Sequence, residues 1–511
     1  MTTRSLILTA DQVEQLRNHL LRDDGLERAA YIYCSPSGDD RLLAEELVLI
    51  NDDQLAAQSA TECRPTPRTE YDLVQDCTRR DMHPCVVHSH PFDTTQSPDF
   101  SPRDDDLMDG LYRFITGHAP ETATMFAVLG DEGITATVDL PDTDHRETLP
   151  VTVLGNRRLD TPLRNASSTI ATNGSDIDTD RFDRGIRALG EAGQQRLADT
   201  HIAVVGCGGL GDIMAIEFAM YGVGKLTLID PDVVETSNQP RLISATEHHT
   251  GRPKVTTVKQ QLWKANPAVD LTTVQKQVEN AAEALHQADL IVAGVDRVST
   301  REWLNAFAIR HLKPYIDAGV IITTDETDDD TEREAAGRVE TMDGYIQTII
   351  PGVTACWDCL NRGDDEQARI ERLSDDELEE ELERGYIDET QLSPAPAVVP
   401  LNGEVASKTV RLVAKLVTGY AEPADYLHVE TVNNDLTTVT TRPRDTCPTC
   451  GETGILGRGD RKPTEADLAA TEYDIDLQIS AEDTPTDAPH TDETDDRSAV
   501  AAAFAALFDT P

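Results

Sequence analysis

Short apolar segments alternate with helical patterns in the part of the chain that begins at His201. The apolar segments have the length and the β-branched content of buried strands. A helix between two consecutive strands makes the connection long enough for parallel pairing. We therefore expect an α/β region with a doubly wound parallel sheet. The expected elements are, in chain order, HIAVVG, a helix to Tyr221, KLTLID, a helix near 253–265, ADLIVAGV, a helix from Thr300, and PYIDAGV.

A glycine-rich segment follows the first of these strands and opens the next helix. Its glycines, spaced as GxGGxG, are Gly206, Gly208, Gly209 and Gly211. Glycines let the backbone approach a phosphate closely, and the start of a helix supplies partial positive charge. Asp230 ends the following strand, where a ribose-binding carboxylate is expected. These features predict a nucleotide site, and they are equally typical of an NAD(P) dehydrogenase.

The residues after Asp230 distinguish the two kinds of nucleotide site. Asn238 and Arg241 follow in IDPDVVETSNQPRL, and Lys254 stands at the start of the next helix. Hydride transfer needs no such group of cations. Breaking a triphosphate between its α- and β-phosphates does need such cations, because negative charge builds on the transferring and leaving groups. The pattern therefore favours triphosphate chemistry.

The region from about Arg181 to Gly451 resembles the ThiF/MoeB/ubiquitin-activating superfamily. The matching landmarks are FDRGIRALGEAGQQRL, the GxGGxG loop, the series Asp230, Asn238, Arg241 and Lys254, and Asp296 with Arg301 in GVDRVSTR. The resemblance implies a Rossmann-like, ThiF-type domain that binds ATP and Mg²⁺. The implied roles are ribose binding by Asp230, phosphate binding by Asn238, Arg241 and Lys254, and magnesium binding by Asp296.

The same resemblance implies a substrate and an oligomeric state. The C-terminal glycine carboxylate of a ubiquitin-like or sulfur-carrier protein would attack the α-phosphate of ATP to give an acyl-adenylate and pyrophosphate. Arg184 matches the family arginine that reaches into the neighbouring subunit's site. A homodimer is therefore implied, with Arg184, Arg241 and Lys254 acting in catalysis. The implied enzyme is a ubiquitin-like modifier-activating adenylyltransferase.

Two CxxC motifs in the same region predict a structural zinc site. Cys356 and Cys359 form the first motif, and Cys447 and Cys450 form the second. Four thiolates at this spacing close a tetrahedral site and leave no open position for catalysis. Many ubiquitin-activating enzymes also carry the protein as a thioester on a cysteine after the first motif. Because no cysteine lies between Cys359 and Cys447, we expect transfer to an external thiol, sulfur donor or amine.

Residues 1–154 have a separate α+β pattern that contains a second candidate metal site. A helical pattern from Ala10 to Leu21 precedes short apolar strands and polar turns. The strand CVVHSH carries His88 and His90, which lie on one face because they are two residues apart. A carboxylate follows in SPRDDD. Two imidazoles and one carboxylate leave a fourth zinc position open for water, as in catalytic zinc sites.

This run resembles the JAB/MPN (JAMM) metalloprotease motif, HxHP followed by SxxD. The implied ligands of a catalytic zinc ion are His88, His90 and Asp104, with Asp105 or Asp99 as alternatives to Asp104. The implied catalytic residues are Ser101, which would stabilise the oxyanion, and Glu27 as general base, with Glu45 or Glu46 as alternatives to Glu27. The other interpretation is an inactive MPN scaffold with an ordinary histidine pair.

The charge of the chain excludes one class of partner. The sequence has 93 acidic and 45 basic residues and a formal net charge of -48 at pH 7. Binding a nucleic acid requires a basic surface, so we expect no nucleic-acid partner. A salt-rich cytoplasm would screen this charge, which indicates a halophilic protein of haloarchaeal-type composition. No run of about 18 apolar residues and no signal-peptide core occurs in the sequence, so we expect a cytoplasmic protein without membrane association.

Composition also predicts the domain boundaries. The JAB/MPN-like domain occupies residues 1–154. Residues 155–180 are rich in Ser, Thr, Asn and Asp, which predicts a flexible linker. Residues 181–457 form the adenylating domain with its zinc site. Residues 458–511 are acidic and of low complexity, which predicts a disordered tail.

Both halves together predict a bifunctional enzyme of ubiquitin-like protein chemistry. One half would activate the terminal glycine of the carrier with ATP, and the other would cleave a peptide or isopeptide bond after that glycine. Two alternatives stay open. The first is activation of a sulfur carrier for cofactor or cysteine biosynthesis, and the second is a nucleotide-binding scaffold with an inactive MPN domain.

Overall fold

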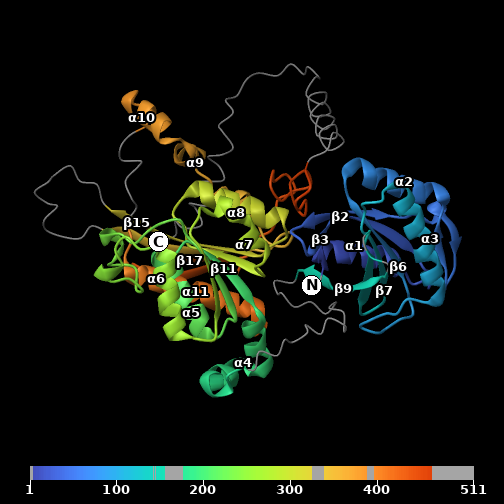
Figure 1. The fold of residues 1–511 in the computed structure, drawn as a ribbon, viewed down its shortest axis with the longest axis horizontal. Helices are drawn as coiled ribbons and strands as arrows, with labels where there is room; N and C mark the ends of the chain where they lie inside the picture. The colour runs from blue at the N-terminus through green and yellow to red at the C-terminus, as the bar shows by residue number, and fades with distance from the viewer. Residues whose placement is uncertain are drawn as a thin grey trace, which may run out of the picture. The chain divides into compact units, whose positions relative to one another are not determined.

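A computed structural model describes residues 4–155, except 142 and 144, together with residues 177–324, 339–387 and 396–462. These residues form an N-terminal lobe that ends at residue 155 and a C-terminal lobe that begins at residue 177 (Figure 1). Apart from their ends, the predicted linker and the predicted tail lie outside the described residues. Residues 458–462, which were assigned to the tail, are part of the compact unit that ends at Lys462.

The N-terminal lobe is built on an eight-stranded mixed sheet in the order β10-β1-β3-β2-β6-β7-β8-β9. The strands are β1 (Ser5–Thr9), β2 (Ala29–Ser37), β3 (Arg41–Leu49), β6 (His83–Ser89), β7 (Thr124–Leu129), β8 (Ile134–Asp139), β9 (Glu147–Leu149) and β10 (Val151–Leu154). A separate ribbon pairs β4 (Leu55–Gln58) with β5 (Cys63–Pro65). Both parallel and antiparallel pairs occur, for example β6 with β7 and β2 with β6.

Helices pack on both faces of this sheet because successive side chains of each strand point to opposite sides. The helices are α1 (Ala10–Leu20), α2 (Pro67–Arg80) and α3 (Pro102–His118). In β2, Ala30 and Ile32 belong to the apolar cluster that includes Leu16 of α1. Tyr31 of the same strand belongs to the cluster that includes Leu73 of α2 and residues of α3.

The C-terminal lobe is built on a second eight-stranded sheet in the order β13-β12-β11-β14-β15-β16-β17-β18. The strands are β11 (His201–Val205), β12 (Lys225–Ile229), β13 (Asp270–Val274), β14 (Leu290–Ala293), β15 (Tyr315–Thr324), β16 (Val339–Ile349), β17 (Tyr426–Glu430) and β18 (Asp435–Val439). The pairs from β13 to β15 are parallel, as predicted for a doubly wound sheet, and their order is that of a Rossmann fold. The antiparallel extension from β15 to β18 was not predicted.

The helices of this lobe are α4 (Thr179–Asp199), α5 (Gly209–Tyr221), α6 (Lys254–Ala265), α7 (Ala282–His286), α8 (Val298–Arg310), α9 (Asp365–Arg372), α10 (Asp375–Glu383) and α11 (Val399–Thr418). Of these, α5 and α11 pack on one face of the sheet and α8 packs on the other. α8 begins at Val298 and not at the predicted Thr300. None of the described helices is both long enough and apolar enough to cross a membrane.

The strand order reverses between β11 and β14, which are neighbours in the sheet. Phe218 of α5, the helix that follows β11, packs in the cluster on one face. Leu304 of α8, the helix that follows β14, packs in the cluster on the other face. In open α/β sheets ligands bind at the carboxyl ends of the strands where such helices diverge. The glycine loop lies at this position.

The segment after β18 connects the two lobes. Gly459 N–H donates to the carbonyl of Arg310 (2.9 Å), and Asp460 N–H donates to the carbonyl of Pro36 in β2 (2.7 Å). The side chain of Arg461 is buried and lies 2.5 Å from the carboxylate of Glu45 in β3. These bonds hold residues 459–461 against both lobes.

Candidate functional site

The glycine loop makes a tight turn between β11 and α5. Gly206 has φ 83°, a conformation that favours glycine. A Cβ atom at Gly211 would lie 1.7 Å from the carbonyl oxygen of Gly206, so the loop and the start of α5 are in direct contact. Gly208 is the N-cap of α5, and a Cβ atom there would have no neighbour within 4 Å. The space beside Gly208 is therefore open to a ligand.

Asp230, which follows β12 directly, connects this loop to the end of that strand by hydrogen bonds. One carboxylate oxygen accepts a hydrogen bond from the N–H of Cys207 (2.6 Å), and the other accepts one from the N–H of Asp232 (2.8 Å). Burial raises the pKa of the Asp230 carboxyl, and the charge of Lys254 and the two backbone donors oppose this effect. Asp230 thus lies beside the loop and is hydrogen-bonded to it, and its role in ribose binding stays a prediction.

Lys254 is the first residue of α6, and its ammonium group lies 2.7 Å from the carboxylate of Asp232. Burial lowers the pKa of Lys254, but the carboxylates of Asp230, Asp232 and Asp296 outweigh this effect and raise it. All three carboxylates therefore act on the same ammonium group. Asp232 was not selected from the sequence.

Two side chains meet at Gly209. A Cβ atom at this glycine would lie 2.2 Å from Nδ2 of Asn402 and 3.6 Å from Cδ of Arg241. Asn402 is buried in the first turn of α11. Asn402 was not predicted from the sequence, because one polar residue at the start of an apolar helix has no motif around it. Arg241 thus lies at the loop, and its role in phosphate binding stays a prediction.

The segment that carries Arg241 is held against α5 by Asp212. The buried Asp212 carboxylate accepts hydrogen bonds from the N–H (2.8 Å) and the hydroxyl group of Ser244. Asn238 is also buried in this segment, and its Oδ1 accepts a hydrogen bond from the N–H of Glu235 (3.1 Å). The Asn238 side chain therefore stabilises its own turn, and a role in phosphate binding stays a prediction.

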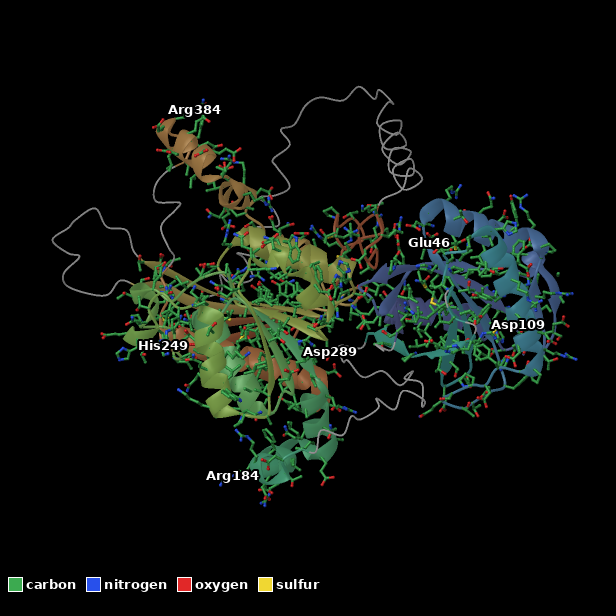
Figure 2. The ribbon with its side chains drawn as sticks, viewed as in Figure 1. Glu46, Asp109, Arg184, His249, Asp289 and Arg384 are labelled. Atoms are coloured by element: carbon green, nitrogen blue, oxygen red, sulfur yellow. The ribbon has the colours of Figure 1, made fainter. Side chains whose placement is uncertain are left out.

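Asp296 and Arg184 are exposed. Asp296 lies in the loop between β14 and α8, and the side chain of its neighbour Val295 lies 3.0 Å from a Cβ atom placed at Gly206. The Asp296 loop is thus beside the glycine turn. Arg184 lies in the first half of α4, at the outer end of that helix and away from the sheet (Figure 2). The structure does not bring Arg184 to the glycine loop of its own chain.

The two CxxC motifs meet in the C-terminal lobe. Cys356, Cys359, Cys447 and Cys450 are all buried, and their sulfur atoms lie within 4.8 Å of one another. The Sγ atoms are 3.6 Å apart between Cys356 and Cys447 and 3.3 Å apart between Cys359 and Cys450. The N–H of Arg444 donates to Sγ of Cys359 (3.3 Å). Four free thiols in this arrangement fit a structural zinc ion.

A second cluster lies in the N-terminal lobe. Nε2 of His88 lies 3.3 Å from Nε2 of His90, and the two carboxylate oxygens of Asp104 lie 3.3 Å and 3.4 Å from these nitrogens. Glu27 approaches Nε2 of His90 at 4.0 Å. Burial raises the pKa of Asp104, but His88 and His90 outweigh this effect and hold it well below its usual range. Two imidazoles and a carboxylate in contact fit a zinc site with one open position.

Neighbouring elements bring these side chains together. β6 ends beside β2, with His88 opposite Ala29, so Glu27 just before β2 lies near both histidines. Asp104 lies in the first turn of α3, whose N-cap is Ser101. The hydroxyl of Ser101 accepts a hydrogen bond from the N–H of Asp104 (3.3 Å), and its N–H donates to the Asp104 carboxylate (2.6 Å). Ser101 therefore orients the carboxylate.

The structure also shows where the alternative candidates for the general base and for the carboxylate ligand lie. They are occupied elsewhere or lie outside the cluster: Glu45 pairs with Arg461, Glu46 pairs with Arg80, Asp105 lies 3.9 Å from Arg146, and Asp99 is exposed. Figure 2 shows Glu46 on the surface of the N-terminal lobe. The geometry therefore favours Glu27 and Asp104 over the alternatives.

Comparison with known proteins agrees with the geometry of the C-terminal lobe. The model of the ThiF family matches residues 182–449. The chain belongs to the ThiF family. The vegetative HesA protein of Trichormus variabilis is 27% identical to it over 270 residues, which cover 52% of this chain and 85% of HesA. The sulfur carrier protein ThiS adenylyltransferase of Escherichia coli is 36% identical over 131 residues, which cover 25% of this chain and 52% of that protein.

Among solved structures, the chain is similar to that of the microcin C7 biosynthetic enzyme MccB in complex with N-formylated MccA. It aligns with 54% of this chain and 76% of its own, at 20% sequence identity and a TM-score of 0.43. Members of the ThiF family activate ubiquitin-like or sulfur-carrier proteins by adenylation and bind ATP and Mg²⁺. Family membership thus favours adenylyl transfer over the dehydrogenase alternative. The matched residues begin at 182, so the JAB/MPN assignment of the N-terminal lobe stays a prediction.

Proposed function

We propose that the C-terminal lobe is an ATP-dependent adenylyltransferase for the C-terminal glycine of a ubiquitin-like or sulfur-carrier protein. The observation that carries this proposal is the convergence of Arg241, Lys254 and the Asp296 loop on the glycine turn that Asp230 fastens. The open space beside Gly208 suits a phosphate chain, because backbone N–H groups at the start of α5 face it. Family membership supports the same chemistry.

In the proposed reaction a carboxylate oxygen of the carrier attacks the α-phosphorus of ATP. The bond from that phosphorus to the bridging oxygen breaks, and pyrophosphate leaves. Arg241 and Lys254 neutralise the charge that builds on the phosphates. Asp230 binds the ribose and keeps the loop in place. Asp296 would hold a magnesium ion, which would supply further positive charge to the leaving group.

The adenylate then passes to an external thiol, sulfur donor or amine, because the sequence from Cys359 to Cys447 contains no further cysteine for a thioester. A second copy of the chain supplies Arg184 to the site, in a homodimer. The exposed position of Arg184 on α4 supports this role.

We place the protein in the cytoplasm of a halophilic cell. The four free thiols of the zinc site fit a reducing cytoplasm. The net charge of -48 fits a cytoplasm that is rich in salt.

ATP–pyrophosphate exchange tests this proposal. The full-length protein is assayed in high salt with a carrier that ends in glycine and with the same carrier lacking that residue. We expect exchange with the first carrier and none with the second. Absence of exchange with folded, zinc-loaded protein and every carrier would favour the nucleotide-binding scaffold. A thiocarboxylate on the carrier would indicate sulfur-carrier metabolism for cofactor or cysteine synthesis, and an isopeptide-linked carrier would indicate conjugation.

We also propose that the N-terminal lobe is a zinc metallopeptidase that cleaves the peptide or isopeptide bond after the same glycine. The contact of His88, His90 and Asp104, with Glu27 beside them, favours this second function. His88, His90 and Asp104 would hold a zinc ion, which would supply a Lewis acid that makes water nucleophilic near neutral pH. Glu27 accepts the proton of the attacking water. The hydroxyl of Ser101 already accepts a hydrogen bond from Asp104 N–H, which leaves its own proton for the oxyanion.

A further inference from the structure

A third group of metal-binding side chains lies outside both sites. His286 ends α7, His311 follows α8 directly, and Asp460 belongs to the segment after the cysteine cluster. Each offers one ligand atom, and the three atoms lie within 4.8 Å of one another. We propose that these three residues bind a transition-metal ion of the Zn²⁺ class, which clamps the segment around Asp460 to the ends of α7 and α8.

The side chains face one another. Nε2 of His286 lies 3.8 Å from Oδ1 of Asp460. The rings of His286 and His311 are nearly perpendicular, at 87°, with their centroids 4.6 Å apart. Nδ1 of His286 is buried and has no hydrogen-bond partner among the described residues. Buried polar atoms are almost always paired, so the imidazole of His286 still lacks a partner in this cluster.

Ser37 and Gly38, at the end of β2, already contact the other polar atoms of His311 and Asp460. The N–H of Gly38 donates to Oδ2 of Asp460 (2.6 Å), which leaves Oδ1 on the side of His286. The hydroxyl of Ser37 lies 3.1 Å from Nδ1 of His311. A Cβ atom at Gly38 would lie 3.4 Å from the ring of His286. Metal-binding histidines and carboxylates are typically oriented in this way by hydrogen bonds from a second layer of residues.

The ligand types narrow the choice of metal. Lys313 donates to the carbonyl of His286 (2.7 Å), and Arg41 donates to the carbonyl of His311 (2.9 Å), so both cations hold the backbone of a proposed ligand. Mg²⁺ and Ca²⁺ prefer sets of oxygen ligands, which two imidazoles do not supply. Two imidazoles and one carboxylate favour Zn²⁺ or a similar ion, because imidazole nitrogen binds these metals strongly. Three protein ligands leave one position for water.

Cobalt binding tests the proposal. His88→Ala and His90→Ala are first introduced into the full-length chain, so that the result does not depend on the metal proposed for the N-terminal lobe. The chain is loaded with Co²⁺, desalted and analysed for bound metal and for its absorption spectrum. Adding Asp460→Asn, which keeps an acceptor for the N–H of Gly38, is expected to remove one metal equivalent. The thiolate charge-transfer band of the four-cysteine site should remain unchanged.

Glu283→Gln is the matched control, because Glu283 lies on α7 beside His286 and outside the cluster. This variant should bind as much cobalt as its parent. His311→Gln gives a second, independent ligand removal and should also lose one equivalent while the thiolate band persists. The proposal is overturned if both ligand variants, folded by circular dichroism, bind as much cobalt as the parent chain.

Discussion

The ammonium group of Lys254 lies 2.7 Å from the carboxylate of Asp232 at the edge of the glycine loop. The Asp232 side chain is 61% exposed, whereas that of Lys254 is 12% exposed. Water screens the exposed carboxylate of Asp232, so its pairing contributes little to stability. We therefore expect a triphosphate to replace Asp232 as the partner of Lys254 at little cost, with Asp232 orienting the lysine until the nucleotide binds.

Lys254→Ala should lower kcat/KM for ATP–pyrophosphate exchange by about 10²–10³, the usual effect of losing one group that neutralises transition-state charge. Asp232→Asn should have a smaller effect, because the carboxylate only orients the lysine. Lys259→Ala is the control, since Lys259 also lies on α6 but donates to the carbonyl of Leu271. Equal losses for Lys254→Ala and Lys259→Ala would contradict the assignment.

Gly209→Ala should raise KM for ATP, because its Cβ would lie 2.2 Å from the amide of Asn402 and displace that side chain. Alanine suits the helix that begins at this residue, so the defect should come from this contact. In an Asn402→Ala background the same change should cost little, with a coupling of about 1 kcal/mol between the two sites. A double-mutant cycle on ATP binding measures this coupling. Additive effects would show that the two residues act independently.

Glu27→Gln should abolish cleavage of a carrier fusion while the N-terminal lobe still binds zinc, because Glu27 is the proposed base and not a ligand. His88→Ala should lose both cleavage and zinc. Glu46→Gln is the control, since this glutamate pairs with Arg80, and its cleavage rate should equal that of the wild type. Cleavage and zinc content are measured on the same samples. A fully active Glu27→Gln variant would remove the metallopeptidase proposal.

Cys359→Ser should release the structural zinc and lower the thermal stability of the C-terminal lobe, because the metal joins two segments that are distant in sequence. A strong chelator should act on the wild type in the same direction. Cys77→Ala removes a buried thiol of α2 and should leave this zinc content unchanged. Zinc analysis and thermal melting measure both effects. Retention of all zinc by the Cys359→Ser chain would argue against the predicted site.

Protein stability should fall as the pH is lowered through about 6.5, the usual histidine pKa, in part because of His201. Burial lowers the pKa of His201, and the charge of Lys225 acts in the same direction. Below that pH the unfolded chain binds a proton that the folded chain does not bind, so acid favours unfolding. In His201→Gln the urea midpoint should fall less between about pH 7.5 and about pH 5.5. Identical pH dependence of wild type and variant would exclude this contribution.

The sequence predicted the elements that depend on local patterns. The parallel strands, the helix after the glycine loop and Lys254 at the start of α6 all lie where they were expected. The predicted tail boundary at 458 was wrong, because Arg461 is buried against Glu45 of the N-terminal lobe. The antiparallel strands β16 to β18 were also missed. Both depend on contacts between segments far apart in the chain, which composition and periodicity do not record.

Spacing alone determined the glycine loop, the two CxxC motifs and the His88–His90 pair, because one turn or one strand fixes the distance between such close neighbours in sequence. Only the tertiary structure selected Glu27 over Glu45 and Glu46, since all three glutamates are compatible with the motif but one lies beside the histidines. The tertiary structure alone also revealed two groups of neighbouring residues, which sheet and helix packing brings together. They are Asn402 with Gly209, and His286 with His311 and Asp460. Which side chains meet across long separations is decided by burial of the apolar faces, and that is a property of the whole packed chain.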